Sequence, residues 1–285
     1  MTVNQLSSTD AFYVLDLDDA PRSTGVVRWA KKILVDGAEN LARGVTYSYA
    51  ALGIQAGGAS AGVNAAPDGR DAALRAFVDE LAPVVAAGTL RLTPGKGVSA
   101  DDLAGLSGPE ASADGDATSA LVSGIIAAAT AAVGGLDGRK VALEASGLAG
   151  PALRSAFEAA GAEIVADGPD ALASECDVLA VGSKAGVVDH ENVADLAGRT
   201  IVPVAPLAVT TRAVASGRRA GVTILPDFVT TAGPLVDDGR DPADVIAALI
   251  QEIAGHAEGP SIGACERAEA FLSTWRDSLP FGRPI

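Results

Sequence analysis

Short apolar runs alternate with stretches of helical periodicity along most of this 285-residue chain, and the alternation is clearest after Gly138. In that part we expect strands at 140–145, 163–166, 177–181, 200–204 and 222–225, and helices at 148–160, 170–175, 191–196, 211–216 and 242–256. Parallel strands are joined by crossover connections that usually contain a helix, so strict alternation indicates a parallel sheet. The pattern therefore predicts an α/β fold with a Rossmann-like, doubly wound parallel sheet domain.

The first part of the chain shows the same alternation less regularly. We expect strands at 11–17, 61–66 and 89–92 and helices at 39–52 and 69–87. Ser99, followed three residues later by Asp102, has the spacing of a capping box and predicts the start of a short helix. This part is therefore predicted to form a smaller α/β domain of its own.

Residues 105–116 separate the two patterns. They are mostly Gly, Ser, Ala, Asp and Pro, a composition typical of a linker. We expect a first domain at 1–110 and a Rossmann-like domain at 117–255. The remaining segment, 256–285, is predicted to pack back on the body of the protein through a helix at 266–275.

The charge balance argues against a nucleic-acid partner. The formal net charge is −15 and the sequence pI is about 4.4. Phosphate backbones are bound by clustered Lys and Arg, and only 21 such residues are spread along the chain against 36 Asp and Glu. We interpret the acidity as a solubilising surface and expect a small-molecule ligand or nucleotide as the partner.

We expect a cytoplasmic protein without a membrane partner. The first ten residues lack the basic and apolar regions of a signal peptide. Residues 117–136 are uncharged over a bilayer-length window, but their Ala, Gly, Ser and Thr contribute little transfer energy, which favours a buried helix. The two cysteines, Cys176 and Cys265, fit a reducing compartment better than a disulfide framework.

The segment at 140–150 has the order strand, tight turn, helix that a dinucleotide-binding loop requires. Its turn comprises Ala145, Ser146, Gly147, Leu148, Ala149 and Gly150. Gly147 would let the backbone approach a pyrophosphate, whose charge the N-terminus of the next helix would favour. Asp167, about 20 residues downstream, is placed to accept ribose hydroxyls and repel a 2′-phosphate, so NAD is favoured over NADP. The competing interpretation is a turn whose glycines serve packing alone.

Several stretches match motifs of one enzyme family. They are Thr24-Gly25-Val26-Val27-Arg28, Val45-Thr46-Tyr47-Ser48, Gly57-Gly58-Ala59-Ser60, the segment 177–192, and Pro226-Asp227-Phe228-Val229-Thr230-Thr231-Ala232-Gly233. Over about 24–236 the chain resembles the Glu/Leu/Phe/Val family of amino-acid dehydrogenases, in which the first stretch forms a turn. The resemblance implies a first domain for substrate binding and oligomerisation. It also implies NAD-linked oxidative deamination of an L-amino acid to a 2-oxo acid and ammonia.

The chain departs from this family where the chemistry is expected. By the resemblance, Ser48 replaces a lysine that binds the substrate carboxylate, and Ser60 replaces the catalytic lysine, whose pKa is lowered so that it acts as a base. Gly95 stands in the place of an aspartate. Ser183 and Thr231 are implied to lie at the cofactor, where Thr231 and Leu207 replace two asparagines. No catalytic residue of the family is therefore expected to remain.

Few residues are available as substitutes. Lys96 lies next to the vacant acid position, Lys184 follows a predicted strand, and Arg28 is suited to bind a carboxylate in bidentate fashion. The alternative for both lysines is an ordinary solvated surface charge. His190 and His256 have no cysteines or carboxylates at ligand spacing, so no metal site is predicted.

Two functions remain open from the sequence. The first is a divergent amino-acid dehydrogenase-like protein with lost or altered catalysis. The second is a non-catalytic nucleotide- or metabolite-binding regulator, or a partner subunit of an active dehydrogenase. A homodimer, or association with an active paralogue, is the assembly that these hypotheses suggest.

Overall fold

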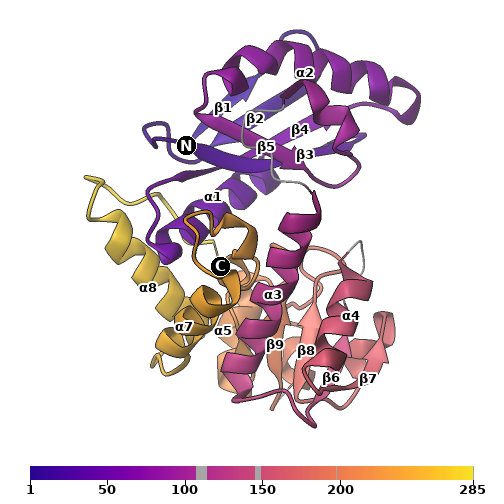
Figure 1. Ribbon diagram of the computed structural model, residues 1–285, viewed down its shortest axis with the longest axis vertical. Coiled ribbons are helices and arrows are strands. Elements are labelled where there is room, and N and C mark those ends of the chain that lie inside the picture. The colour runs from indigo at the N-terminus through magenta and orange to yellow at the C-terminus, as the bar shows by residue number, and fades with distance from the viewer. Residues whose placement is uncertain (107–113, 145–148, 197, 285) are drawn as a thin grey trace. The chain divides into compact units, whose positions relative to one another are not determined.

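The computed structural model describes residues 1–106, 114–144, 149–196 and 198–284. The chain divides into two compact units, each with its own five-stranded sheet (Figure 1). The first unit comprises Met1–Asp114 and Glu269–Pro284, and the second comprises Gly115–Ala268. The predicted α/β class, with a parallel Rossmann-like sheet in the second unit, is confirmed.

The first unit is built on a mixed sheet. In spatial order its strands are β1 (Thr2–Gln5), β2 (Ala11–Leu15), β4 (Gly57–Asn64), β3 (Ser23–Ala30) and β5 (Leu90–Pro94). Strand β3 is parallel to both of its neighbours, β4 and β5, whereas β2 is antiparallel to β4 and to β1. The carboxyl ends of β3, β4 and β5 consequently lie at the same edge of the sheet.

Helix α1 (Val35–Leu52) covers one face of this sheet and approaches β4 closely (Figure 1). A Cβ added at Gly58 would lie only 1.8 Å from the carbonyl oxygen of Ala42 on α1. The Gly58 N–H donates a hydrogen bond of 2.9 Å to the hydroxyl of Thr46 on the same helix. The helix ends at Gly53, whose left-handed φ of 76° suits glycine. The packing of α1 on β4 therefore requires glycine at position 58.

Helix α2 (Arg70–Ala86), which follows the short helix η1 (Pro67–Gly69), covers the opposite face. The core that it forms with β4 includes Ala59, Ala61, Val63, Leu74, Phe77 and Leu81. Because side chains alternate along a strand, Gly58, Ser60 and Gly62 face the α1 side. This alternation decides which polar residues share a face of the sheet.

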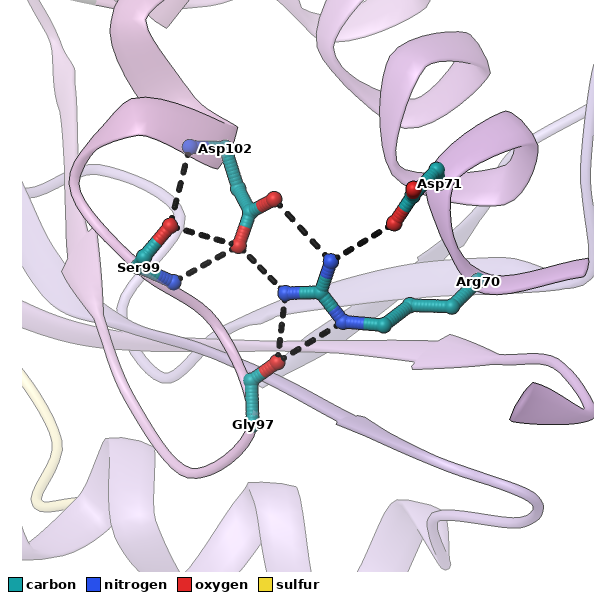
Figure 2. A network of polar contacts seen from close by, with 5 residues as sticks. All are labelled: Arg70, Asp71, Gly97, Ser99 and Asp102. Atoms are coloured by element: carbon teal, nitrogen blue, oxygen red, sulfur yellow. Dashed lines mark hydrogen bonds and ion pairs between the residues drawn. The ribbon is translucent and has the colours of Figure 1, made fainter. Parts of the chain in front are cut away.

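The predicted capping box at Ser99 and Asp102 is confirmed, and it opens the short helix η2 (Asp101–Leu106). The Ser99 N–H donates to Asp102 Oδ2 at 2.7 Å, and the Asp102 N–H donates to Ser99 Oγ at 3.3 Å. Arg70 donates to Asp102 Oδ1 at 3.1 Å and to the Gly97 carbonyl at 2.9 Å (Figure 2). The Arg70 guanidinium and the Ser99 donors lower the pKa of Asp102 to about 2. This network fixes the segment after β5 against α2.

The second unit is built on a parallel sheet. In spatial order its strands are β7 (Glu163–Asp167), β6 (Lys140–Leu143), β8 (Val178–Val181), β9 (Thr200–Pro203) and β10 (Thr223–Ile224). Numbered within this unit, the order is 2-1-3-4-5, so the chain changes direction across the sheet between β6 and β8. All four residues of β8 are buried, which is typical of a parallel sheet covered on both faces.

Helices and short 3₁₀ turns connect these strands. The longer helices are α3 (Asp114–Val133), α4 (Gly150–Ala159), α5 (Thr211–Ala220), α7 (Pro242–Ala254) and α8 (Pro260–Leu272), and the short elements are η3 (Pro169–Ala173), η4 (Val193–Leu196), α6 (Asp227–Thr230) and η5 (Gly233–Leu235). Asp241 caps α7 by accepting from the Ala243 N–H at 2.7 Å. Within the described ranges, no helix is long and apolar enough to cross a bilayer.

The expected turn at 24–28 is wrong, because this segment lies inside β3 and pairs with strands on both sides. Gly25 serves a close strand contact there: a Cβ would lie 1.9 Å from the Ala59 carbonyl oxygen. The sequence also gave no indication of β1 or α6. The helices expected at 170–175 and 191–196 are the short 3₁₀ elements η3 and η4.

The contact between α1 and β4 gives a stability prediction. Gly58→Ala should lower the free energy of unfolding by about 2–3 kcal/mol, because the added methyl group collides with the α1 backbone. Gly44→Ala, in α1 where a Cβ would meet nothing within 4 Å, should raise it by about 0.5–1 kcal/mol through helix propensity. Urea unfolding of both variants measures the difference. Equal effects of the two substitutions would contradict the close packing.

Candidate functional site

The three positions at which the family resemblance implies charged residues, Ser48, Ser60 and Gly95, all lie in the first unit. Ser48 is on α1, and its hydroxyl donates to the Gly44 carbonyl at 3.1 Å. Ser60 lies in the middle of β4 and is fully buried. Gly95 directly follows β5. No charged side chain stands at any of the three.

Ser60 shares a face of the sheet with Arg28 on β3. Ser60 pairs in register with Val26, and Gly62 pairs with Arg28. Residues two apart on a strand point to the same side, so both Ser60 and Arg28 face the α1 side. The atoms Ser60 Oγ, Arg28 Nε and Arg28 Nη2 are buried and, among the described residues, have no hydrogen-bond partner. The structure thus brings together two residues that the sequence marked separately.

Arg43, a buried arginine of the same unit, shows how the buried N–H groups of a guanidinium are usually paired. Its Nε donates to both carboxylate oxygens of Asp16, at 2.8 and 2.9 Å, and its Nη1 donates to the carbonyls of Phe281 and Gly282. Arg28 has no such partner, and burial lowers the pKa of its guanidinium. A buried charged donor left unpaired costs roughly 1–3 kcal/mol or more, so an anion that paired with Arg28 would gain binding energy from relieving this penalty.

Gly95 is held by the backbone beside Arg28. Its N–H donates to the Val27 carbonyl at 2.9 Å. A Cβ at position 95 would lie 2.7 Å from that carbonyl oxygen and 3.2 Å from Arg28 Cγ. An aspartate at this position would require the backbone of β3 or β5 to move. The structure therefore has no space for the acid that the family resemblance implies.

The two lysines considered as substitutes lie on the surface. Lys96 and Lys184 are both exposed, and within the described ranges neither forms an ion pair. The backbone of Lys96 accepts a hydrogen bond from the Trp29 N–H at 2.9 Å, which directs the chain but not the ammonium group. Both placements agree with the interpretation of solvated surface charges.

The carboxyl ends of β6 and β8 form the second candidate site. In open parallel sheets, ligands bind where the strand order changes direction, here between these two strands. Four of the six predicted loop residues, Ala145, Ser146, Gly147 and Leu148, lie outside the described residues. Ala149 and Gly150 lie at the start of α4, and no side chain of the described residues caps this helix. Its first N–H groups thus lack the partner that a capping side chain would supply.

Glu144, which the sequence analysis did not single out, lies at this edge. Its carboxylate is buried and accepts hydrogen bonds from the Gly182 N–H at 3.1 Å and the Ser183 N–H at 3.2 Å. The Ser183 hydroxyl donates to the same carboxylate. The sequence indication that could have identified Glu144 is its position, as an acidic residue at the end of an otherwise apolar strand. The carboxylate occupies these donors at the strand ends and places a negative charge there.

Asp167 lies at the end of β7 and pairs with Arg154 of α4, with 2.8 Å between Arg154 Nη1 and Asp167 Oδ2. Both side chains are more than 40% exposed, so this ion pair contributes little to stability. A neighbouring arginine suits a 2′-phosphate, whereas an aspartate suits ribose hydroxyls. The geometry therefore offers a contact for either NAD or NADP.

The loop after β9 is held in a strained conformation. Leu207 has a φ of 61°, the only positive φ of a non-glycine residue in the described chain. Its N–H donates to Asp227 Oδ2 at 2.6 Å, and its carbonyl accepts from the Gly186 N–H at 2.8 Å. Thr231 donates its hydroxyl to the Asp227 carbonyl at 2.7 Å. The left-handed conformation suits asparagine better than leucine, which agrees with the asparagine implied at this position.

Among the described residues, no group of three or more His, Cys, Asp or Glu side chains is arranged to hold a metal ion. A cavity of about 670 Å³ lies in the second unit between α3 and α4. Small and apolar residues line it, including Val122, Ile126, Ala152 and Ala156. This cavity presents no charged group for a ligand.

Asp227 predicts a specific pH dependence of stability. Burial raises the pKa of its carboxyl group to about 6, although the Leu207 and Phe228 N–H groups favour the charged form. The folded state therefore binds this proton more tightly than the unfolded state, and the contribution of Asp227 to stability falls as the pH rises from about 4 to about 6. Urea unfolding from pH 4 to 8 should show the wild type losing stability relative to Asp227→Asn between about pH 4 and about pH 6. A constant difference would contradict the raised pKa.

No family model matches this sequence, and a search among curated proteins also found no match. Solved structures do match it. The hetero-hexameric glutamate dehydrogenase from Thermus thermophilus, in its Leu-bound form, superposes with a TM-score of 0.76 at 18% identity, over 95% of this chain and 86% of that chain. L-tryptophan dehydrogenase from Nostoc punctiforme gives a TM-score of 0.69 at 20% identity, over 96% of this chain and 95% of that chain.

The glutamate dehydrogenase of Plasmodium falciparum gives a TM-score of 0.73 at 12% identity, over 93% of this chain and 79% of that chain. Identities of this size speak to the fold rather than to the chemistry. This chain therefore has the two-part α/β fold of amino-acid dehydrogenases.

Proposed function

We propose that this chain is a divergent amino-acid dehydrogenase-like protein that has lost efficient oxidative deamination and keeps the binding of a small metabolite. One observation carries the proposal: Ser48, Ser60 and Gly95 replace two lysines and an acid, and the backbone at Gly95 leaves no space for a side chain. The dehydrogenase fold supports the relationship, and the residues support the loss of chemistry.

Removing hydride from an amino acid and then adding water to the resulting imine requires a positioned base. A serine hydroxyl does not accept a proton at neutral pH, and the two serines lie in places where a lysine ammonium or amine is implied. One positioned acid–base group typically contributes ~10²–10⁴-fold to a rate. The joint loss of such groups predicts turnover near the uncatalysed level.

A nicotinamide dinucleotide is the cofactor that the second unit suits best. When bound, this cofactor would supply the hydride acceptor. The strand order, the uncapped start of α4 and the Asp167–Arg154 pair support such a site at the carboxyl ends of β6 and β8. The buried carboxylate of Glu144 opposes it, because it places a negative charge at the edge where a pyrophosphate would bind. We therefore propose weak nucleotide binding.

A second candidate is a partner subunit or regulator of an active dehydrogenase. The match to a hetero-hexameric glutamate dehydrogenase in a Leu-bound form favours it, because that assembly contains more than one kind of subunit. Mass photometry of this chain, alone and mixed with an active dehydrogenase from the same genome, separates the two candidates. Mixed oligomers would support the partner role, and a homodimer that ignores the active enzyme would support the first candidate.

The loss of catalysis is tested by turnover assays. We expect no change in nicotinamide absorbance with any L-amino acid plus NAD or NADP, or with any 2-oxo acid plus ammonia and the reduced cofactor. Ser48→Lys with Ser60→Lys should also stay inactive, because Gly95 still lacks the acid. Turnover by the wild-type chain would contradict the proposal.

The role of Glu144 is tested by removing its charge. Glu144→Gln should strengthen NAD binding about 10-fold, because a buried charge next to a pyrophosphate opposes binding more than an amide does. Glu163→Gln is the matched control, since Glu163 is exposed at the opposite end of the sheet, at the start of β7. Calorimetric titration with NAD measures both variants. Equal affinities of the two variants would show that Glu144 does not oppose the nucleotide.

A further inference from the structure

We propose that Arg28 and Ser60 form a binding site for the carboxylate group of a small aliphatic acid on the α1 face of the first unit's sheet. This inference deepens the proposed function and rests on it in one respect, namely that the first unit has kept a ligand-binding role. The family resemblance implies a carboxylate-binding lysine on the helix, at the position of Ser48. The proposed site instead places the carboxylate contact on strand β3.

The unsatisfied donors of Arg28 and Ser60 carry the argument. Arg28 Nε and Nη2 are buried, and in the described part of the chain they have no hydrogen-bond partner. The same holds for Ser60 Oγ, on the adjacent strand and the same face. Nearly all buried polar groups of folded proteins are paired, so several unpaired ones on one face indicate a missing partner.

The partner that fits is an anion. A guanidinium presents its N–H groups as a fork that matches the two oxygens of a carboxylate, and a hydroxyl can donate a further hydrogen bond. Arg43, which is buried in the same unit, pairs in this way with the carboxylate of Asp16. For Arg28 no described residue supplies the carboxylate, and position 95, directly after β5 and beside Arg28, is glycine.

The surroundings of Arg28 favour an aliphatic acid over a polyanion. Phe12 and Ile33 fill the space over Gly62, the register partner of Arg28 on β4, since a Cβ there would lie 2.9 and 3.0 Å from them. Apolar side chains therefore border Arg28 on the β4 side, and a ligand bound to Arg28 would meet them there. Phosphate, which needs more donors to replace its hydration, is disfavoured there.

Strand β3, which carries Arg28, is held on its opposite face by a contact between Trp29 and Arg70. The next residue, Trp29, points to the α2 side, where the Arg70 guanidinium lies over its ring at 5.6 Å from the ring centre. Arg70 is itself fixed by Asp102 and Gly97 (Figure 2). These contacts fix the backbone of β3 at Arg28, so binding a ligand there requires less ordering of the strand.

Calorimetric titration of the full chain with sodium 3-methylbutanoate, without any nucleotide, tests the site. We expect saturable binding to wild type, at least 10-fold weaker binding of the neutral isostere 3-methylbutanamide, and no comparable binding of inorganic phosphate. Arg28→Gln should weaken 3-methylbutanoate binding about 10–100-fold, the range expected for a charge-assisted contact. Ser60→Ala should weaken it less. Lys32→Gln, which removes an exposed charge just after β3, is the matched control and should bind as wild type does.

The melting temperature of each variant without ligand shows whether a loss of binding results from misfolding. Arg28→Gln should melt at or above the wild-type temperature, because it removes an unpaired buried charge. Failure of wild type to bind 3-methylbutanoate, equal binding by Arg28→Gln or by the amide, or preferential binding of phosphate would each overturn the assignment. Because no cofactor is present, such a failure is distinguishable from failure of the proposed function, which turnover and nucleotide titration report.

Discussion

The close approach of α1 to β4 is the constraint on which the first unit depends. The helix backbone lies so near the strand that even one methyl group at Gly58 would collide with it. The helix carries Ser48 and the strand carries Ser60, so this contact sets the distance between the two positions at which the resemblance implies lysines. The alternation along β4 then decides that Ser60 shares a face with Arg28, while the intervening alanines form the core under α2.

The electrostatics of this unit depend on its partly and fully buried arginines. Where the resemblance implies two lysines and an acid, the chain has serine, serine and glycine, and Arg28 is a half-buried cation whose buried Nε and Nη2 have no partner among the described residues. The contrast with Arg43 is informative because both arginines are in the same unit. The N–H groups of Arg43 donate hydrogen bonds to Asp16 and to two backbone carbonyls, as expected for a structural ion pair. The buried N–H groups of Arg28 have no partner among the described residues, as expected for a ligand-binding group.

In the second unit the fold and the local chemistry point in different directions. The parallel strand order creates the edge at which nucleotides bind in such sheets, and α4 begins beside it. The Glu144 carboxylate, however, takes the N–H groups of Gly182 and Ser183 for itself. The strained Leu207, held by Asp227, keeps a backbone shape that suits asparagine. Both features are consistent with the proposal that this edge binds a nucleotide only weakly.

The sequence alone determined the α/β class, the parallel second sheet and the capping box at Ser99, because these depend on local periodicity and short spacings. It also identified the three uncharged positions by their motifs. Only the tertiary structure decided that 24–28 is a strand, that Arg28 and Ser60 share a face, and that Glu144 binds the end of β8. Such facts depend on which strands become neighbours and in which register, and residues far apart in the chain set both.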